Sequence, residues 1–334
     1  MKTKSLSIFF IILVLSSIVF ACATKDFIPD EDAGFFGTWV VADPSNGFNY
    51  GYYYYIPNTL QLASKKYLLV IPNNSGGLTN YTIDSRQIHA RAAQGQINSN
   101  KYLADELGVV LLVPAIPRPW STPPDIEPQI LNRVALQTSH GNHARVDLQL
   151  TRMIDDVKNI CAGWGIDLEP KVLLNGFSAS GNFGNRFTAL HPDLVHAVVS
   201  GGVAGNPILP IDTIGEERLI YPVGIADLSE LTGTSFNLQQ YKTIPQFIFM
   251  GSDDTNDPLQ SRHFWGDAER RIITMKMGTN MKERFEFAEN VYKEQGINAI
   301  FKIYSGVGHG LNNQIVSNII DFFRSNCEGV RGSI

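Results

Sequence analysis

The chain has 334 residues, of which 44% are hydrophobic, 10% aromatic and 18% charged, and its formal net charge is −5. A disordered chain would be poorer in apolar residues and carry more net charge, so this composition excludes disorder as the dominant state. The negative charge also excludes a protein that binds nucleic acid through bulk electrostatics. No internal repeat with a period of about 20 to 50 residues is visible, which argues against solenoids and propellers.

Residues 1–22 have the pattern of a bacterial lipoprotein signal peptide. Lys2 and Lys4 form a positive start, and Ser7–Ala21 is an uncharged apolar run. This run is shorter than the ~20 residues that a helix needs to span a bilayer, so it reads as a secretory segment. It ends in Val19-Phe20-Ala21-Cys22, which resembles a lipobox. The alternative is an ordinary signal peptide cut nearby.

If the lipobox is used, Cys22 becomes the lipidated first residue of the exported protein. Acyl chains would then tether it to a bacterial membrane, facing the periplasm or the cell surface. Residues 23–35 would serve as the tether. The membrane is the one partner expected besides a substrate, because no motif indicates a protein partner.

Cys161 and Cys327 are the two other cysteines. Export would place them in an oxidising compartment, where a disulfide can form and persist. Each lies near the end of a predicted helix, but no pattern shows that the two helix ends meet. Pairing of these cysteines stays open at this point.

Short apolar runs alternate with helical patterns from residue 36 to about residue 330. A turn at Pro44–Gly47 joins two β-rich runs into an antiparallel hairpin. The later runs are continuously apolar, as in parallel strands buried on both faces. The predicted strands are 39–42, 50–56, 67–71, 109–113, 171–174, 195–199, 246–250 and 299–304, and the predicted helices are 146–162, 181–190, 281–295 and 312–325.

This alternation predicts an α/β protein. We expect an eight-stranded, mostly parallel sheet with helices on both faces and the hairpin at its N-terminal edge. No linker rich in Pro, Gly or Ser separates two cores, so residues 36–330 should form a single domain. The stretch 203–243 is long for a connection between strands, and such segments usually carry function or their own structure. We expect it to form a cap.

The motif Gly176-Phe-Ser178-Ala-Ser180-Gly181 follows one of the predicted strands and leads directly into a helix. This strand–turn–helix context is typical of a nucleophile elbow, where small flanking residues let the strand and the helix approach closely. Ser180 replaces the second glycine of the usual pattern. The alternative is a glycine- and serine-rich turn without chemistry.

A serine nucleophile needs a base, and the base needs an orienting acid. His309 lies in the glycine-rich stretch Gly306–Gly310 after the last strand, which leaves room for the imidazole to reach the serine. Asp254 is the expected acid, because it is the third residue after Gly251 at the end of a strand. Asp257 is the alternative, although it precedes a proline and could instead shape the turn.

The order Ser, Asp, His, the elbow and the eight strands together resemble the α/β-hydrolase family. Within it, the stretch Arg145–Asp156 and the motif at 176–181 look most like bacterial poly(3-hydroxybutyrate)-depolymerase-like and feruloyl-esterase-like members. The resemblance implies an oxyanion hole made of two backbone N–H groups. One would belong to Ala179, and the other to Asn74 or Ser75 in the loop after the third strand.

The sequence therefore predicts a serine esterase that works through an acyl-enzyme. Its substrate would be an extracytoplasmic polyester or a carbohydrate-linked ester. No cofactor or metal is expected: His140 and His143 have a spacing that could bind one, but no third ligand is clear. Two alternatives stay open, a catalytically inactive surface-binding lipoprotein on the same fold and a serine peptidase.

Overall fold

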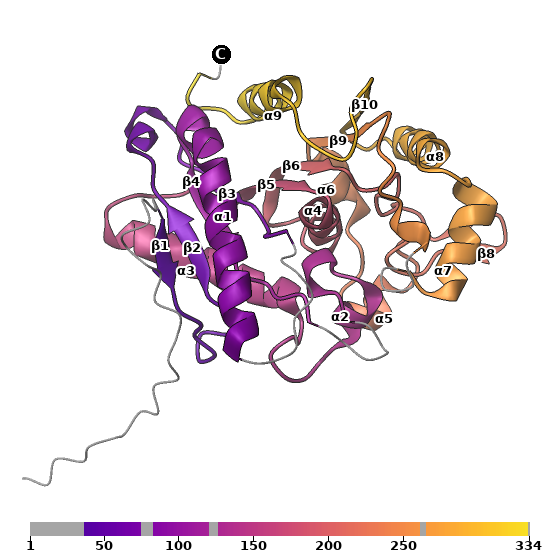
Figure 1. The fold of residues 1–334 in the computed structure, drawn as a ribbon, viewed down its shortest axis with the longest axis horizontal. Helices are drawn as coiled ribbons and strands as arrows, with labels where there is room; N and C mark the ends of the chain where they lie inside the picture. The colour runs from indigo at the N-terminus through magenta and orange to yellow at the C-terminus, as the bar shows by residue number, and fades with distance from the viewer. Residues whose placement is uncertain (1–36, 75–82, 120–125, 261–264, 333–334) are drawn as a thin grey trace, which may run out of the picture.

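The central sheet has eight strands in the order β1-β2-β4-β3-β5-β6-β9-β10 in the computed structural model, which describes residues 37–74, 83–119, 126–260 and 265–332 (Figure 1). The predicted signal peptide, Cys22 and the predicted tether, residues 23–35, all lie outside the described residues. The strands are β1 Thr38–Val40, β2 Tyr52–Tyr55, β3 Leu68–Val70, β4 Val110–Pro114, β5 Val172–Phe177, β6 Val195–Gly201, β9 Gln246–Gly251 and β10 Ala299–Tyr304.

The predicted strand directions are confirmed. β2 pairs antiparallel with both β1 and β4, and every pair from β4 to β10 is parallel. The parallel strands therefore all end at the same edge of the sheet. The loops after β3, β5, β9 and β10 meet there, and these are the loops that hold the predicted site residues.

Alternating side chains of β9 show why its apolar run is continuous. Phe247 and Phe249 belong to a core cluster with residues of α1 (Ile83–Leu107) and α9 (Asn313–Asn326), on one side of the sheet. Ile248 and Met250 point to the other side and pack in a cluster with residues of α8 (Met281–Glu294). A strand covered on both faces needs apolar residues at every position, which is the pattern that the sequence carries.

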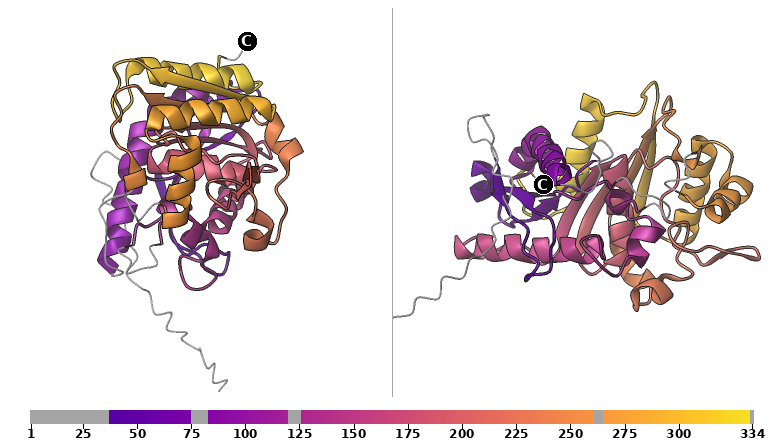
Figure 2. Two further views of the ribbon diagram at one scale, coloured as in Figure 1. Left: turned by 90° about the vertical axis from the view of Figure 1, so that its right-hand side faces the viewer. Right: turned by 60° about the horizontal axis from the view of Figure 1, so that its bottom comes forward.

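Helices cover both faces of the sheet, as predicted. α3 (Val146–Gly163) and α4 (Ala179–Leu190) contribute to the cluster opposite α1 and α9. In Figures 1 and 2, α8 and α7 (Asp267–Ile272) lie at the β10 end of the molecule, away from β1. Helix α1 is the longest and was not predicted. No described helix combines the length and apolar character that a membrane span requires.

The stretch 203–243 contains small elements of its own. They are a two-stranded ribbon, β7 (Thr213–Ile214) and β8 (Glu217–Arg218), and two short helices, α5 (Leu228–Thr232) and α6 (Leu238–Thr243). Tyr221 is fully buried and donates a hydrogen bond of 2.5 Å to the carbonyl oxygen of Leu131. This long connection is therefore attached to the loop that precedes α2 (Arg133–Gln137).

The two buried cysteines are free thiols and form no disulfide. Cys161 on α3 belongs to the core cluster on one face of the sheet, whereas Cys327, just after α9, belongs to the cluster on the other. The sheet itself separates the two thiols. Burial raises the pKa of Cys161 to about 11 and that of Cys327 to about 12, so both are protonated at neutral pH.

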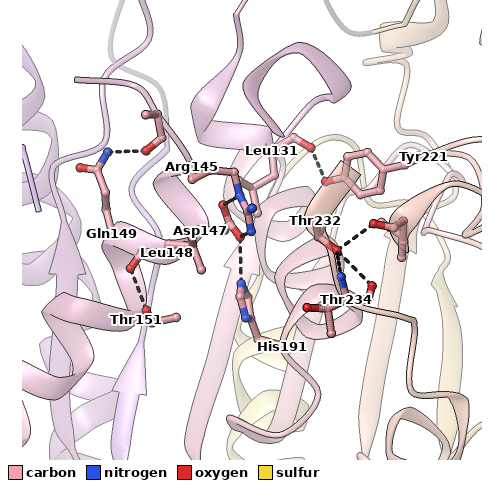
Figure 3. A network of polar contacts seen from close by, with 12 residues as sticks. Leu131, Arg145, Asp147, Leu148, Gln149, Thr151, His191, Tyr221, Thr232 and Thr234 are labelled. Atoms are coloured by element: carbon pink, nitrogen blue, oxygen red, sulfur yellow. Dashed lines mark hydrogen bonds and ion pairs between the residues drawn. The ribbon is translucent and has the colours of Figure 1, made fainter. Parts of the chain in front are cut away.

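A buried ion-pair network joins the start of α3 to the end of α4 (Figure 3). Arg145 donates two hydrogen bonds to the Asp147 carboxylate, at 2.9 and 2.7 Å, and His191 Nε2 lies 3.0 Å from the same group. Burial alone would raise the pKa of Asp147, but these donors outweigh it and lower the pKa to about 2. Because Ser178 immediately precedes α4, this network anchors the helix that follows the predicted nucleophile.

We expect Asp147→Asn to lower the free energy of unfolding by about 2–4 kcal/mol at pH 7, because it removes one partner of a buried ion pair. The folded-state pKa is depressed, so the stabilisation by Asp147 is complete above about pH 4 and is lost as the pH falls toward 2. Urea unfolding between pH 7 and pH 2 measures both effects, and the difference between the variant and the parent should shrink in acid.

Asp155→Asn on the same helix is the matched control. Asp155 lies 3.7 Å from Arg152, and both side chains are mostly exposed. Exposed pairs contribute little, so its effect should stay within about 0.5 kcal/mol. An Asp147→Asn effect as small as this, or one that does not change with pH, would contradict the assigned role of the network.

Candidate active site

The turn between β5 and α4 holds Ser178 in a strained backbone conformation. Its φ is 61° and its ψ is −121°, and the next residue already begins the helix. Non-glycine residues at positive φ cost of order 1–3 kcal/mol, and such strain clusters at functional sites. The conformation lifts the serine side chain out of the strand-to-helix turn, where it remains partly exposed.

Two glycines permit this turn. A Cβ at Gly176 would lie 2.2 Å from the carbonyl oxygen of Ser180, and a Cβ at Gly181 would lie 2.4 Å from that of Gly201. Both distances are far below van der Waals contact. Strand and helix can therefore approach each other only because these two positions lack side chains.

Ser180 stands where the usual motif has a glycine, and its hydroxyl bonds to the turn itself. Ser180 Oγ accepts a hydrogen bond from the N–H of Phe177 and donates one to the carbonyl oxygen of Phe177, both at 2.9 Å. The side chain is fully buried. The substitution is accommodated because the serine satisfies two backbone groups of the residue that precedes Ser178.

The structure brings Ser178, His309 and Asp254 together in one chain of hydrogen bonds. His309 Nε2 lies 2.9 Å from Ser178 Oγ, and His309 Nδ1 lies 2.8 Å from Asp254 Oδ2. Each residue follows a different parallel strand, β5, β9 or β10, at the same edge of the sheet. The imidazole is 25% exposed and the Asp254 side chain only 2%, so the acid end of the chain is shielded from water.

The loop after β9 separates the two candidate acids. Asp254 Oδ1 accepts a hydrogen bond of 2.9 Å from the N–H of Asn256, which orients the carboxylate toward His309. Asp257 instead lies 2.7 Å from Nη2 of Arg284, a fully buried residue of α8. The carboxylate that contacts the histidine is therefore that of Asp254, and Asp257 ties its loop to α8.

Close neighbours limit where the imidazole can go. The His309 ring lies against the ring of Phe177, with centroids 4.8 Å apart. A Cβ at Gly202, whose φ is 61°, would lie 3.3 Å from His309 Cε1 and 2.9 Å from the Phe177 ring. Sequence reasoning missed both residues, although Phe177 stands inside the elbow motif.

Asn256 is a further site residue that sequence reasoning missed. Its side-chain Nδ2 lies 3.1 Å from His309 Nε2, the same nitrogen that Ser178 contacts. The one available signal was its position within the acidic run after β9. That run was interpreted for its aspartates alone.

The N-terminus of α4 and the loop after β3 form the neighbourhood of the predicted oxyanion hole. The N–H of Ala179 makes no hydrogen bond within the described part of the chain. Asn74 Oδ1 accepts a hydrogen bond of 3.0 Å from the N–H of Ser180, which holds the β3 loop beside the elbow. Asn73 ties the same loop to Ile116 through two bonds of 2.8 Å. Ser75 lies outside the described residues.

Of the two histidines considered as metal ligands, His140 is exposed and His143 contacts another side chain. His143 Nδ1 lies 2.7 Å from the hydroxyl of Tyr50, and burial together with nearby His89 lowers the pKa of His143 to about 4. Among the residues that the structure describes, no group of three or more His, Cys, Asp or Glu side chains could hold a metal ion.

The fold is similar to that of solved hydrolase structures. Poly(aspartic acid) hydrolase-1 from Sphingomonas sp. KT-1 superposes with a TM-score of 0.54 at 18% identity, over 85% of this chain and 97% of that one. LpqC, a poly(3-hydroxybutyrate) depolymerase from Bordetella parapertussis, superposes with a TM-score of 0.51 at 16% identity, over 86% of this chain and 89% of that one. No protein-family model and no curated protein matches the sequence. The chain therefore has the α/β-hydrolase fold.

We expect Ser180→Ala to lower the free energy of unfolding by about 1–3 kcal/mol, because two backbone groups of Phe177 lose a buried hydrogen-bond partner. Urea unfolding at pH 7 measures the loss. Ser317→Ala, at an exposed position of α9, is the matched control and should change stability by less than about 0.5 kcal/mol. Equal effects of the two substitutions would show that the hydroxyl of Ser180 does not stabilise the elbow.

Proposed function

We propose that the protein is a serine hydrolase that cleaves carboxylic esters. The observation that carries this proposal is the hydrogen-bonded chain from Ser178 through His309 to Asp254, built on a strained elbow. Ser178 Oγ attacks the ester carbonyl carbon while His309 Nε2 takes the hydroxyl proton. His309 then gives this proton to the leaving alcohol, and an acyl group remains on Ser178.

Asp254 and the backbone amides have supporting parts in this mechanism. With Nδ1–H donated to Asp254, the lone pair of Nε2 faces Ser178, and the buried carboxylate stabilises the imidazolium that forms. The N–H of Ala179 at the start of α4 is placed to donate to the developing oxyanion, and Asn74 or Ser75 would supply the second donor. A single such donor contributes on the order of 3–4 kcal/mol of transition-state stabilisation.

The proposed substrate is an ester of an extracytoplasmic polymer, either a polyester or a carbohydrate-linked ester. The lipobox-like stretch that ends at Cys22 supports export and anchoring in a bacterial membrane. The similarity to a poly(3-hydroxybutyrate) depolymerase supports a polymeric ester. Ester cleavage is preferred to amide cleavage because an alcohol is more readily expelled than an amine.

We expect the purified protein to hydrolyse p-nitrophenyl acetate and butyrate. Ser178→Ala should lower kcat by at least about 10⁴-fold, because it removes the nucleophile. Ser317→Ala should leave kcat unchanged. Release of p-nitrophenol measures turnover, and a fluorophosphonate probe followed by peptide mapping measures labelling at Ser178.

The same experiment separates the alternatives. A folded parent protein that neither turns over these esters nor is labelled at Ser178 would contradict the esterase proposal and favour the inactive binding protein. Labelling at Ser178 with a kcat/KM for peptide substrates that exceeds the kcat/KM for the esters would favour a peptidase.

The acid can be identified by a pair of isosteric substitutions. Asp254→Asn should lower kcat by about 10³–10⁴-fold while the fold persists, because the carboxylate that orients His309 is lost. Asp257→Asn should cause a far smaller loss of kcat but destabilise the protein by about 2–4 kcal/mol, because it leaves buried Arg284 without its anion. Steady-state kinetics and urea unfolding of both variants test this, and the reverse pattern would assign the acid to Asp257.

A further inference from the structure

Asn256 contacts two members of the proposed triad, Asp254 and His309. Its backbone N–H donates to Asp254 Oδ1 at 2.9 Å, and its side-chain Nδ2 lies 3.1 Å from His309 Nε2. The backbone bond fixes the residue relative to the acid. Asn256 is exposed, and its side-chain amide lies at the same His309 nitrogen that Ser178 Oγ contacts.

Two donors, Ser178 Oγ and Asn256 Nδ2, therefore compete for the one lone pair of His309 Nε2. In the neutral imidazole, Nδ1 carries the proton toward Asp254 and Nε2 is an acceptor. Ser178 Oγ at 2.9 Å and Asn256 Nδ2 at 3.1 Å both lie within hydrogen-bond distance of it. Once Ser178 is acylated, its oxygen has no proton to donate, whereas the amide of Asn256 keeps both of its protons.

We propose that Asn256 holds the water molecule that hydrolyses the acyl-enzyme, an inference that rests on the proposed esterase function. The amide N–H of Asn256 donates to the water oxygen, and one water O–H donates to His309 Nε2. These two hydrogen bonds, to groups that lie 3.1 Å apart, hold the water at His309 Nε2, which is itself 2.9 Å from the Ser178 oxygen that carries the acyl group. Positioning of this kind raises the effective concentration of the nucleophile.

The step balances with the groups at hand. The water oxygen forms a bond to the acyl carbonyl carbon as its proton passes to His309 Nε2. The tetrahedral intermediate then breaks its bond to Ser178 Oγ, and Oγ takes the proton back from Nε2. The products are the free carboxylic acid and the starting enzyme.

A p-nitrophenyl ester isolates this step from acylation. The p-nitrophenolate leaves without needing a proton, so the proposed water position beside His309 Nε2 contributes little to acylation by this substrate. Deacylation depends on that position, because the attacking water must be held there. Stopped-flow measurement with p-nitrophenyl butyrate gives the acylation rate from the initial burst and the deacylation rate from the linear phase that follows.

The test variant is Asn256→Leu, which keeps the size of the side chain and removes both donors. We expect the deacylation rate to fall about tenfold, as for the loss of one hydrogen bond, and the acylation rate to stay within about twofold. kcat and KM should then fall together, with kcat/KM nearly constant. Asn256→Gln keeps an amide donor and should recover part of the deacylation rate.

Thr255→Ala in the same loop is the matched control and should leave both rates unchanged. Equal losses of the acylation and deacylation rates in Asn256→Leu, or no loss in either, would overturn this inference while the esterase function stands. A parent protein that neither releases p-nitrophenol nor is labelled at Ser178 would overturn the esterase function and this inference with it.

Discussion

The strained turn at Ser178 is the constraint on which the rest of the site depends. A backbone at φ 61° and ψ −121° costs free energy, so the surrounding structure must hold it in place. Gly176 and Gly181 allow β5 and α4 to approach, and the hydroxyl of Ser180 binds the residue before the turn. At its far end, α4 is attached to α3 through His191 and Asp147. The cost of the elbow is thus offset by contacts at both ends of its helix.

The parallel sheet brings residues that are far apart in the sequence close together in space. His309 is 55 residues from Asp254 and 131 residues from Ser178, yet all three lie at the edge where β5, β9 and β10 end. Parallel strands must all point the same way, so their exit loops gather without any direct attraction between the site residues. What remains is fine orientation, which the loop after β9 provides through Asn256 and through the ion pair of Asp257 with Arg284.

Much of the fold follows from local patterns, with one large exception. The eight strands were predicted because doubly covered strands carry continuous apolar runs, and α3 because its apolar residues recur at helical spacing. The longest helix, α1, was missed. Its buried side includes Ala90, Ala93 and Ala104, interspersed with Gln, Asn, Ser and Lys residues. Alanine packs closely against neighbouring elements, but it is only weakly hydrophobic and gives a weak amphipathic pattern in the sequence. The sequence of α1 therefore resembles that of a polar loop.

The sequence by itself determined the eight strands of the sheet along the chain, four of the helices (α3, α4, α8 and α9), the elbow at Ser178, and the residue types that follow the ends of β9 and β10. These depend on periodicity and turn chemistry, which act over a few residues. Only the tertiary structure decided that Asp254 and not Asp257 contacts His309, that Asn256 reaches the same nitrogen as Ser178, and that the sheet separates Cys161 from Cys327. Each of these outcomes depends on contacts between side chains that are far apart in the sequence. The packing of α8, α9 and the loops on the sheet sets these contacts, and no local sequence pattern encodes them.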